Sequence, residues 1–442
     1  MYKSDYILIK DPLHGYIKVY PHEKCVIDSP AFQRLRRIKQ LPAAQYVYPG
    51  AVHTRFSHSL GVMHVAGEFA EFVYSRLDIE KSELERLVMT ARLIGLLHDI
   101  GHGPFSHTFE DYILMRYGVN HEVMGGKIIR ESPELSQCFD RYIEKEYSLS
   151  AEVMSKVVEA STIEFWPLTS RISSDVTERT LYYIIKGPYS ADLIDYILRD
   201  SLYTGANYGL GLDWTRLLHN SIAKGDNIYL EYKAKDVLDH LLIARLYMFK
   251  TVYFHKTARA FDKVMGDLLI RIDDILNFGE AISDVNRYVM LDDDYVLSHP
   301  DVRSTEEAKY LLNRLVPYKV IYESMEPVHG SLSALVRLVK RVAEENLIMK
   351  LKELGANIDS SAIFVDTPKL PTNPMFEDVE IGFVMPDGVI ERRSVRDTAI
   401  GLMPKEIAFF RVYLHVKYSK FIDIAKKLAS RIFKGSELRS FY

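Results

Sequence analysis

The chain has 442 residues, more than one typical domain, which predicts two or three structural units. Hydrophobic residues make up 48% and charged residues 26%, a balance typical of a globular protein without long disordered tracts. The formal net charge of -4 argues against a general nucleic-acid binder, which usually carries a strong basic excess.

The two cysteines, Cys25 and Cys138, are too few for a secreted disulfide scaffold and lack the close spacing of a zinc site. The N-terminus does not read as a signal peptide. No apolar run approaches the ~20 residues needed to span a bilayer. We therefore expect a cytoplasmic protein in a reducing compartment, with no membrane contact.

The N-terminal part predicts extended segments followed by helices. Residues 1–25 suggest short strands around a Pro/Gly turn, and from Pro30 to about residue 345 the pattern is largely helical. Residues 82–85 read as a capping box that opens a helix, and the apolar face of this helix ends at His98. A second helix is expected to follow His58.

The composition changes near residue 356, where runs typical of strands replace the helical pattern. The fold class is therefore expected to be mainly α, with a small α+β unit at the C-terminus. The expected elements are long helices over residues 235–275 and 331–354, strands over 362–365 and 379–384, a turn at 386–388 before a strand at 389–390, and a final helix from Pro404.

Histidines gather in one part of the chain, where seven of the 15 lie within residues 53–121. The densest stretch runs from residue 97 to 107, where a predicted helix leads into His98-Asp99 and Gly101 and Gly103 are expected to let the backbone turn sharply. An isolated His-Asp pair is more often part of a hydrogen-bonded core. Together with further histidines and distant acids, it favours a metal or acid–base site.

A distant acidic stretch covers residues 192–200. If it is helical, Asp192, Asp195, Tyr196 and Arg199 share one face. One interpretation is a solvated face held by an Asp195–Arg199 ion pair. The tyrosine between the acids favours a wall of a sugar-binding site instead.

His58, His98, Asp99 and Asp192 match the H…HD…D signature of the HD phosphohydrolase superfamily, and the flanking residues resemble the dNTP triphosphohydrolase family within it. The resemblance runs from about residue 7 to 430, and it implies an HD-type helical core. Animal members also carry a sterile-alpha-motif domain, which is not expected here. The matching stretches are residues 11–15, 32–36, 38–41, 55–61, 98–107, 195–196, 199–200, 253 and 255–256.

The resemblance implies that His58, His98, Asp99 and Asp192 bind a metal. Two imidazoles and two carboxylates suit a divalent first-row ion such as Fe, Mn, Ni or Zn, and Mg would accompany the nucleotide. It also implies that His107 transfers a proton, that Glu110 orients it, and that His102 and His121 contact the phosphates. The residues implied in substrate binding are Gln40, Leu41, Arg55, Asp195, Tyr196, Asp200, Arg245 and Tyr253.

The resemblance further implies a homo-oligomer, dimer or tetramer, and an allosteric site for a guanine nucleotide or dNTP at Asp28, Gln33 and Arg36. The expected units are a catalytic core over 1–225, a helical extension over 226–355 that completes the active site and oligomer contacts, and the α+β unit over 356–442. The family has lysine, glutamine and lysine where this chain has Leu193, Phe254 and Ile7. These departures leave the base preference and the activator open.

The leading expectation is thus a metal-dependent enzyme that converts a dNTP and water into a deoxynucleoside and triphosphate. A first alternative is another HD-type nucleotidase or a phosphodiesterase acting on nucleotides. A second is a single-stranded nucleic-acid binder with weak or no hydrolase activity. The complete set of ligands and the net charge of -4 argue against the second alternative.

Overall fold

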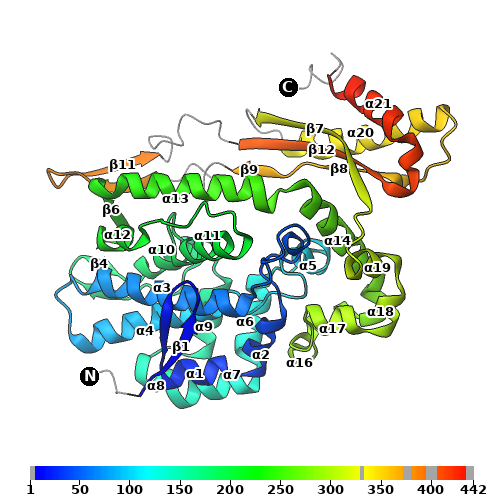
Figure 1. Ribbon diagram of the computed structural model, residues 1–442. Coiled ribbons are helices and arrows are strands. Elements are labelled where there is room, and N and C mark those ends of the chain that lie inside the picture. The colour runs from blue at the N-terminus through cyan, green and yellow to red at the C-terminus, as the bar shows by residue number, and fades with distance from the viewer. Residues whose placement is uncertain (1–4, 329–332, 372–379, 395–405, 435–442) are drawn as a thin grey trace.

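The computed structural model describes residues 5–328, 333–371, 380–394 and 406–434. Helices dominate, which confirms the mainly α class. Figure 1 shows a large helical body, with the long strands β7 and β12 and the helices α20 and α21 along one side of it.

The chain begins with a short antiparallel hairpin, as expected. Its strands are β1 (Ile7–Asp11) and β2 (Gly15–Val19). Helical structure then starts earlier than predicted, at α1 (Pro21–Ile27), before α2 (Pro30–Gln33) and the 3-10 helix η1 (Arg34–Arg37).

Three helices form the centre of the body. They are α3 (Arg55–Tyr74), α4 (Lys81–Leu97) and α11 (Ala191–Thr204), and α3 packs against the other two. His98 caps the C-terminal end of α4, which confirms the predicted end of its buried stripe. His58 lies within the first turn of α3, so the prediction that this helix follows His58 placed its start too late.

The predicted capping box at residues 82–85 is wrong. The N-cap of α4 is Glu80, whose side chain accepts no capping hydrogen bond, and Ser82 already lies in the first turn of the helix. A capping serine must precede the helix with extended backbone, and at Ser82 this geometry is no longer available.

The remaining helices of the body surround this centre. The predicted helix over 235–275 is two helices, separated by the π-helical segment η7 (Phe249–Tyr253). The bounds are α5 (His107–Tyr112), α6 (His121–Glu131), α7 (Pro133–Cys138), α8 (Glu144–Tyr147), α9 (Ala151–Glu159), α10 (Thr180–Lys186), α12 (Trp214–His219), α13 (Lys235–Met248), α14 (Lys256–Leu276), α15 (Phe278–Ser283), α16 (Val285–Tyr288), α17 (Asp293–Ser298), α18 (Pro300–Ser304) and α19 (Glu306–Leu312).

A four-stranded sheet joins distant parts of the chain. It contains β5 (Ser221–Lys224), β6 (Asn227–Glu231), β10 (Glu380–Val384) and β11 (Ile390–Ser394), in the order β11-β10-β6-β5. The predicted hairpin around residues 386–388 is confirmed, since β10 and β11 pair antiparallel. Strand β10 also pairs with β6, and Phe383 belongs to the main core, so this hairpin is continuous with the helical body. A small hairpin, β3 (Arg171–Ser173) and β4 (Val176–Thr177), forms a separate two-stranded sheet that is hydrogen-bonded to Gly225, in the turn between β5 and β6.

The second sheet has a hydrophobic core of its own. It combines β7 (Tyr318–Val328), β8 (Ile363–Asp366), β9 (Lys369–Pro371) and β12 (Glu406–His415), and it packs against α20 (Ser333–Glu353) and α21 (Ile422–Lys434). The C-terminal α+β unit therefore recruits strand β7, from before residue 356.

The final helix predicted from Pro404 is wrong in its position. Pro404 lies outside the described residues, and the segment after it is strand β12, with the helix starting only at Ile422. The run of aromatic and β-branched residues from Phe409 to Tyr413 favours a strand, because such side chains pack well on a pleated surface.

Cys25 and Cys138 form a disulfide between α1 and α7, across a sequence separation of 113 residues. The expectation of two reduced thiols is therefore wrong in this structure. Spacing along the chain could not reveal the pair, because only the packing of α1 on α7 brings the two cysteines together.

Within the described ranges, no helix has the length and apolar character that crossing a bilayer requires.

Candidate metal centre and substrate cavity

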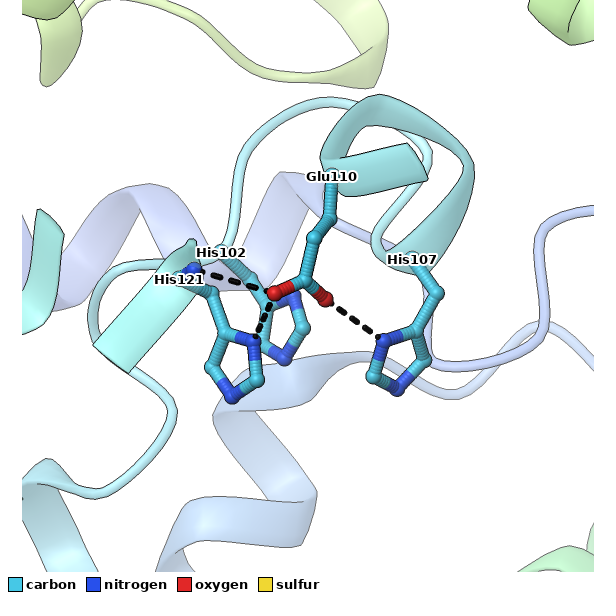
Figure 2. Close-up of side chains that lie close together, drawn as sticks. All are labelled: His102, His107, Glu110 and His121. Carbon is cyan, nitrogen blue, oxygen red and sulfur yellow. Dashed lines mark hydrogen bonds and ion pairs between the residues drawn. The ribbon is translucent and has the colours of Figure 1, made fainter. Parts of the chain in front are cut away.

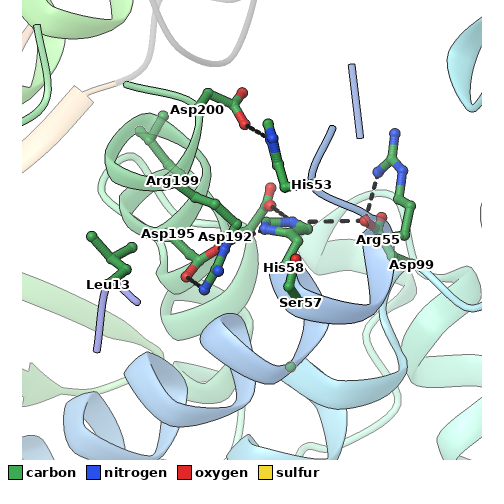
Figure 3. Close-up of polar contacts among 12 residues, drawn as sticks. Leu13, His53, Arg55, Ser57, His58, Asp99, Asp192, Asp195, Arg199 and Asp200 are labelled. Atoms are coloured by element: carbon green, nitrogen blue, oxygen red, sulfur yellow. Dashed lines mark hydrogen bonds and ion pairs between the residues drawn. The ribbon is translucent and has the colours of Figure 1, made fainter. Parts of the chain in front are cut away.

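The four predicted metal ligands converge from three parts of the body (Figure 3). His58 comes from α3, His98 and Asp99 from the end of α4, and Asp192 from the first turn of α11. The Oδ1 atom of Asp192 lies 3.0 Å from Nε2 of His58 and 3.6 Å from Nε2 of His98. Asp99 completes the group, with carboxylate oxygens 3.7 and 3.4 Å from the same two nitrogens.

The two imidazoles are anchored on the side away from this centre. Nδ1 of His98 donates to the carbonyl of Gly95 at 2.8 Å, and Nδ1 of His58 donates to Asp195 at 2.8 Å. Both Nε2 atoms therefore face the two carboxylates, and Nε2 of His98 is buried and has no hydrogen-bond partner among the residues that the structure describes. A buried lone pair without a donor beside two carboxylates fits a cation, so these residues are suited to hold a divalent metal.

The charges around the centre also favour a cation. Burial opposes ionisation of Asp99, but Arg55, which donates to it at 2.5 Å, together with nearby histidines holds the pKa of Asp99 well below its usual range. Burial likewise opposes protonation of His58, yet its bonds to Asp192 and Asp195 raise the pKa of His58 to about 10. Carboxylates therefore stabilise positive charge at this position.

The loop after Asp99 contains two residues with strained backbone directly before His107. Phe105 and Ser106 adopt positive φ values of 59° and 55°, immediately before α5 begins at His107. The side chain of Ser106 is tied to Arg55 and to the carbonyl of Lys39, at 3.0 and 2.7 Å. Such strained backbone persists only where surrounding contacts hold it, and it often marks a functional site.

The backbone turns at Gly101 and Gly103, as predicted, with hydrogen bonds from His102 N to Asp99 O and from Ser106 N to Gly103 O. Neither glycine has a positive φ, however, so these residues are needed for the space that they leave. A Cβ on Gly101 would lie 1.9 Å from the carbonyl oxygen of His121, and one on Gly103 would lie 2.4 Å from the ring of Phe109. Gly101 thereby lets the start of α6 approach the loop and brings His121 to the site.

A second cluster consists of His102, His107, Glu110 and His121 (Figure 2). The Glu110 carboxylate accepts from Nδ1 of His107 at 3.0 Å and from Nδ1 of His121 at 2.7 Å. His102 is buried and stacks on His121 with ring centroids 4.0 Å apart, and its Nε2 lies 3.4 Å from a carboxylate oxygen of Asp99. Burial, Arg55 and His121 hold the pKa of His102 well below its usual value, which keeps this ring neutral.

Glu110 therefore fixes two imidazoles and leaves their Nε2 atoms available. Burial opposes ionisation of Glu110, but its hydrogen bonds to His107 and His121 lower its pKa far below the ordinary value. Ionised Glu110 in turn stabilises a proton on either ring. The side chain of His107 is 66% exposed, so it can reach a ligand in the adjoining cavity.

A cavity of about 360 Å³ has His107 of the second cluster in its lining. Arg55 connects this cavity to the first group, because it lines the cavity and also donates to Asp99. Sequence-predicted residues in the lining are Gln40, Leu41, Arg55, His107, Tyr196, Asp200 and Tyr253. Phe254, the residue that departs from the family pattern, lines the cavity as well.

Polar atoms in the cavity are held in specific positions. Asp200 is 2% exposed and accepts from Nε2 of His53 and from the hydroxyl of Tyr253, both at 2.7 Å. In the described part of the chain, the buried Oε1 of Gln40 has no hydrogen-bond partner. Sequence reasoning missed His53, since only its place in the histidine-rich stretch marked it.

Two predicted substrate contacts do not line the cavity. Asp195 is fully buried behind His58. Arg245 is 5% exposed and donates to the hydroxyl of Tyr196 at 3.2 Å, so it supports a lining residue. The predicted Asp195–Arg199 ion pair is confirmed, but the solvated face is wrong, because both residues are fully buried. The periodicity of α11 could not tell a buried polar face from an exposed one.

The three predicted activator residues lie near one another at the start of the body. Gln33 donates to the carbonyl of Ile27 at 2.8 Å, and Arg36 donates to Gln33 at 2.9 Å. The guanidinium of Arg36 also lies 3.6 Å above the ring of Phe56. Asp28 caps α1, is exposed and pairs with Lys24. A helix begins at Pro30, as predicted.

Two segments of the chain match models of known protein families. Residues 55–167 match the HD domain, and residues 212–382 match the HD associated region. The first match contains His58, His98 and Asp99, while Asp192 lies between the two. The chain is an HD-domain phosphohydrolase.

Its relatives include deoxynucleoside triphosphate triphosphohydrolases. The deoxynucleoside triphosphate triphosphohydrolase SAMHD1 homolog from Dictyostelium discoideum is 28% identical over 382 residues. These residues cover 84% of this chain and 68% of that protein. An uncharacterised protein of Methanocaldococcus jannaschii is 28% identical over 422 residues, 94% of this chain and 80% of that one. The crystal structure of a Bacteroides thetaiotaomicron phosphohydrolase has a TM-score of 0.69 and 25% identity, covering 93% and 100% of the two chains.

Proposed function

We propose that the protein is a metal-dependent deoxynucleoside triphosphate triphosphohydrolase, which converts a dNTP and water into a deoxynucleoside and triphosphate. The observation that carries the proposal is the contact between Arg55 and Asp99. This contact joins the group of proposed metal ligands, which includes Asp99, to the cavity that Arg55 and His107 line. The relatives with dNTP triphosphohydrolase activity in their names support the same reaction.

His58, His98, Asp99 and Asp192 would hold the metal. Their two nitrogens and two oxygens suit Fe, Mn, Ni or Zn, and Mg would accompany the nucleotide phosphates. The bound ion would supply activation of water and neutralisation of phosphate charge.

The chain's own groups would perform the remaining tasks. Arg55 is buried and lines the cavity, so its guanidinium would neutralise a phosphate oxygen there. His107, oriented by Glu110, would donate a proton to the leaving 5′-oxygen. His102 and His121 would contact the phosphates through ring nitrogens that point away from Glu110.

The sugar would lie against Leu41, Tyr196, Tyr253 and Asp200. Tyr196 is backed by Arg245, and Asp200 is held from both sides by His53 and Tyr253, so this wall cannot easily move. Gln40 offers an unpaired acceptor for a sugar hydroxyl. Phe254 gives the cavity an apolar wall in place of the family glutamine, which leaves the base preference open.

This wall predicts discrimination against the ribose 2′-hydroxyl. We expect dATP to be cleaved at least about 100-fold faster than ATP, because a rigid wall rejects an added hydroxyl by clash and by unpaired polar groups. Tyr196→Ala should narrow the ratio of the two kcat/KM values. Equal rates on dATP and ATP in the unaltered protein would contradict the assignment of the wall.

The test of the reaction is product identification. The protein is incubated with each canonical dNTP and NTP and with several metals, and the products are separated by ion-pair chromatography. Intact triphosphate with free deoxynucleoside supports the proposal. Monophosphate or free phosphate would favour another HD-type nucleotidase, and opening of cyclic or alarmone nucleotides alone would favour a phosphodiesterase. Salt-sensitive binding of single strands without turnover would indicate a nucleic-acid binder.

We further propose that a guanine nucleotide or dNTP activates the enzyme at Asp28, Gln33 and Arg36. A carboxylate and a planar guanidinium can both read the edge of a guanine. The Gln33–Arg36 bond and the ring of Phe56 beneath Arg36 hold these groups on one surface. Such a site between subunits would favour a dimer or tetramer by mass action.

Asp28→Ala should therefore abolish activation while leaving the metal in place. Light scattering with and without GTP, together with rate curves against activator concentration, measures the effect. Asp301→Ala is the matched control, since its carboxylate is 75% exposed and lies on α18. A fixed mass and a hyperbolic rate curve unaffected by GTP in the unaltered protein would contradict this regulation.

A further inference from the structure

A buried ionic network lies directly behind the metal ligand His58 (Figure 3). Its centre is the carboxylate of Asp195, which accepts from Nδ1 of His58 at 2.8 Å and from Nε2 of His14 at 2.6 Å. Arg199 donates to both oxygens of the same carboxylate, at 2.8 and 3.0 Å, and to Asp11 at 2.9 Å. The side chains of Asp195 and Arg199 are fully buried, and those of His14 and Asp11 nearly so.

The network ties three parts of the chain together. Asp195 and Arg199 are one turn apart on α11, while Asp11 and His14 belong to the turn of the N-terminal hairpin. The other oxygen of Asp11 accepts from the backbone of Leu13 and His14, at 2.9 and 3.0 Å. Each charged side chain therefore has its partners inside the protein, and the Asp195 carboxylate cannot turn without breaking several bonds.

Gly61 provides the space for this network. It lies on α3 three residues after His58, and a Cβ at this position would lie 1.9 Å from Oδ1 of Asp195 and 2.4 Å from Nη2 of Arg199. Neither side chain can move aside, because both are buried and held by several hydrogen bonds. Only glycine lets α11 bring the carboxylate up to the imidazole of His58.

We infer that Asp195 is a positioning residue for the metal ligand His58, and that Gly61, Arg199 and His14 hold it there. The bond to Nδ1 fixes the tautomer and the ring orientation, so that Nε2 presents its lone pair to the ion. Ionised Asp195 also makes Nε2 of His58 a stronger ligand for the metal, as outer carboxylates do in other metal sites. This role replaces the predicted contact of Asp195 with substrate.

The inference predicts weaker metal binding in two variants. Asp195→Asn removes the charge, and Gly61→Ala displaces the carboxylate. Each should lower the affinity of metal-stripped full-length protein for Mn²⁺ by about 10- to 100-fold in a chelator-competition titration. The melting temperature of the metal-free protein is measured in parallel, to separate lost affinity from lost folding.

Two matched controls distinguish positioning from general destabilisation. Glu23→Gln disrupts a different buried carboxylate–arginine pair, with Arg92, whose hydrogen bonds go to Glu23 and Lys18 and not to a proposed metal ligand. Gly67→Ala adds a Cβ on the same helix, where it would meet Arg92 at 2.8 Å. Both controls should bind Mn²⁺ like the unaltered protein even if they melt earlier. Equal loss of affinity in the controls, or unchanged affinity in folded Asp195→Asn, would overturn the inference.

A spectroscopic measurement on the unaltered protein needs no variant. In the zinc-loaded chain, nitrogen-15 spectra of the histidines should place a hydrogen-bonded proton on Nδ1 of His58 and the metal on Nε2. The opposite assignment would overturn the inference. The inference depends on the metal-binding part of the proposed function only. A protein that binds no metal refutes that part, whereas normal metal binding by folded Asp195→Asn refutes only the positioning role.

Discussion

Replacing Asp99 with alanine is expected to remove the bound metal and lower hydrolysis by at least about a thousandfold. A metal ion stabilises a transferring phosphoryl group by several kcal/mol, and each 1.36 kcal/mol corresponds to a factor of ten in rate. The variant also leaves the guanidinium of Arg55 buried without its carboxylate. Loss of one partner of a buried ion pair typically lowers the free energy of unfolding by about 3–5 kcal/mol.

Metal content by elemental analysis, steady-state rates and thermal denaturation test this prediction on the same preparation. Glu178→Ala is a suitable control, since Glu178 is a buried carboxylate that pairs with Arg86 at 2.6 Å on another part of the body. The control should lose stability and keep its metal. Retained metal and full activity in Asp99→Ala would show that the ion binds elsewhere.

Replacing His107 with alanine is expected to lower kcat by about 10²- to 10⁴-fold without loss of metal, the usual contribution of general acid–base catalysis. The His107 side chain is exposed and, within the described part of the chain, hydrogen-bonds to Glu110 alone, so the fold should not change. The pH–rate profile should lose the limb that reports the protonated acid. His240→Ala, an exposed histidine on α13, serves as the control.

A near-normal kcat in the His107 variant would transfer the acid role to another member of the cluster. His121 is the first alternative, because Glu110 accepts from its Nδ1 in the same way. Glu110→Gln should then impair proton donation by His107 and His121 at once, because Glu110 accepts a hydrogen bond from each. If neither substitution changes kcat, the cluster does not donate the proton, and the proposed mechanism loses its acid.

The proposed metal ligands could be predicted from the sequence because their signal is largely local. His98 and Asp99 end an apolar helix, and the residues around His58 resemble a known family over several positions. The partners of these ligands were harder to find. His14 lies 181 residues from Asp195 and His53 lies 147 residues from Asp200, so neither pair leaves a pattern in a local window.

The errors in the fold have similar causes. The sequence predicts a helix where strand β12 lies, because the neighbours of this strand, β7 and β8, come from distant parts of the chain and strand pairing depends on them. The disulfide between Cys25 and Cys138 depends on the packing of α1 against α7. Gly61 leaves space for α11 and Gly101 leaves space for α6. The sequence could not predict these close approaches, because a glycine that permits one does not differ in sequence from any other glycine.

Metal reconstitution tests the HD centre and the proposed reaction together. The unaltered protein is stripped with a chelator, divided, and supplied with Mn²⁺, Fe²⁺, Ni²⁺, Zn²⁺ or buffer alone before incubation with dGTP and dATP. We predict that the stripped protein is inactive and that one or more of these ions restores release of intact triphosphate and free deoxynucleoside in equal amounts. Full turnover without metal, or restored turnover that yields monophosphate, would contradict the account.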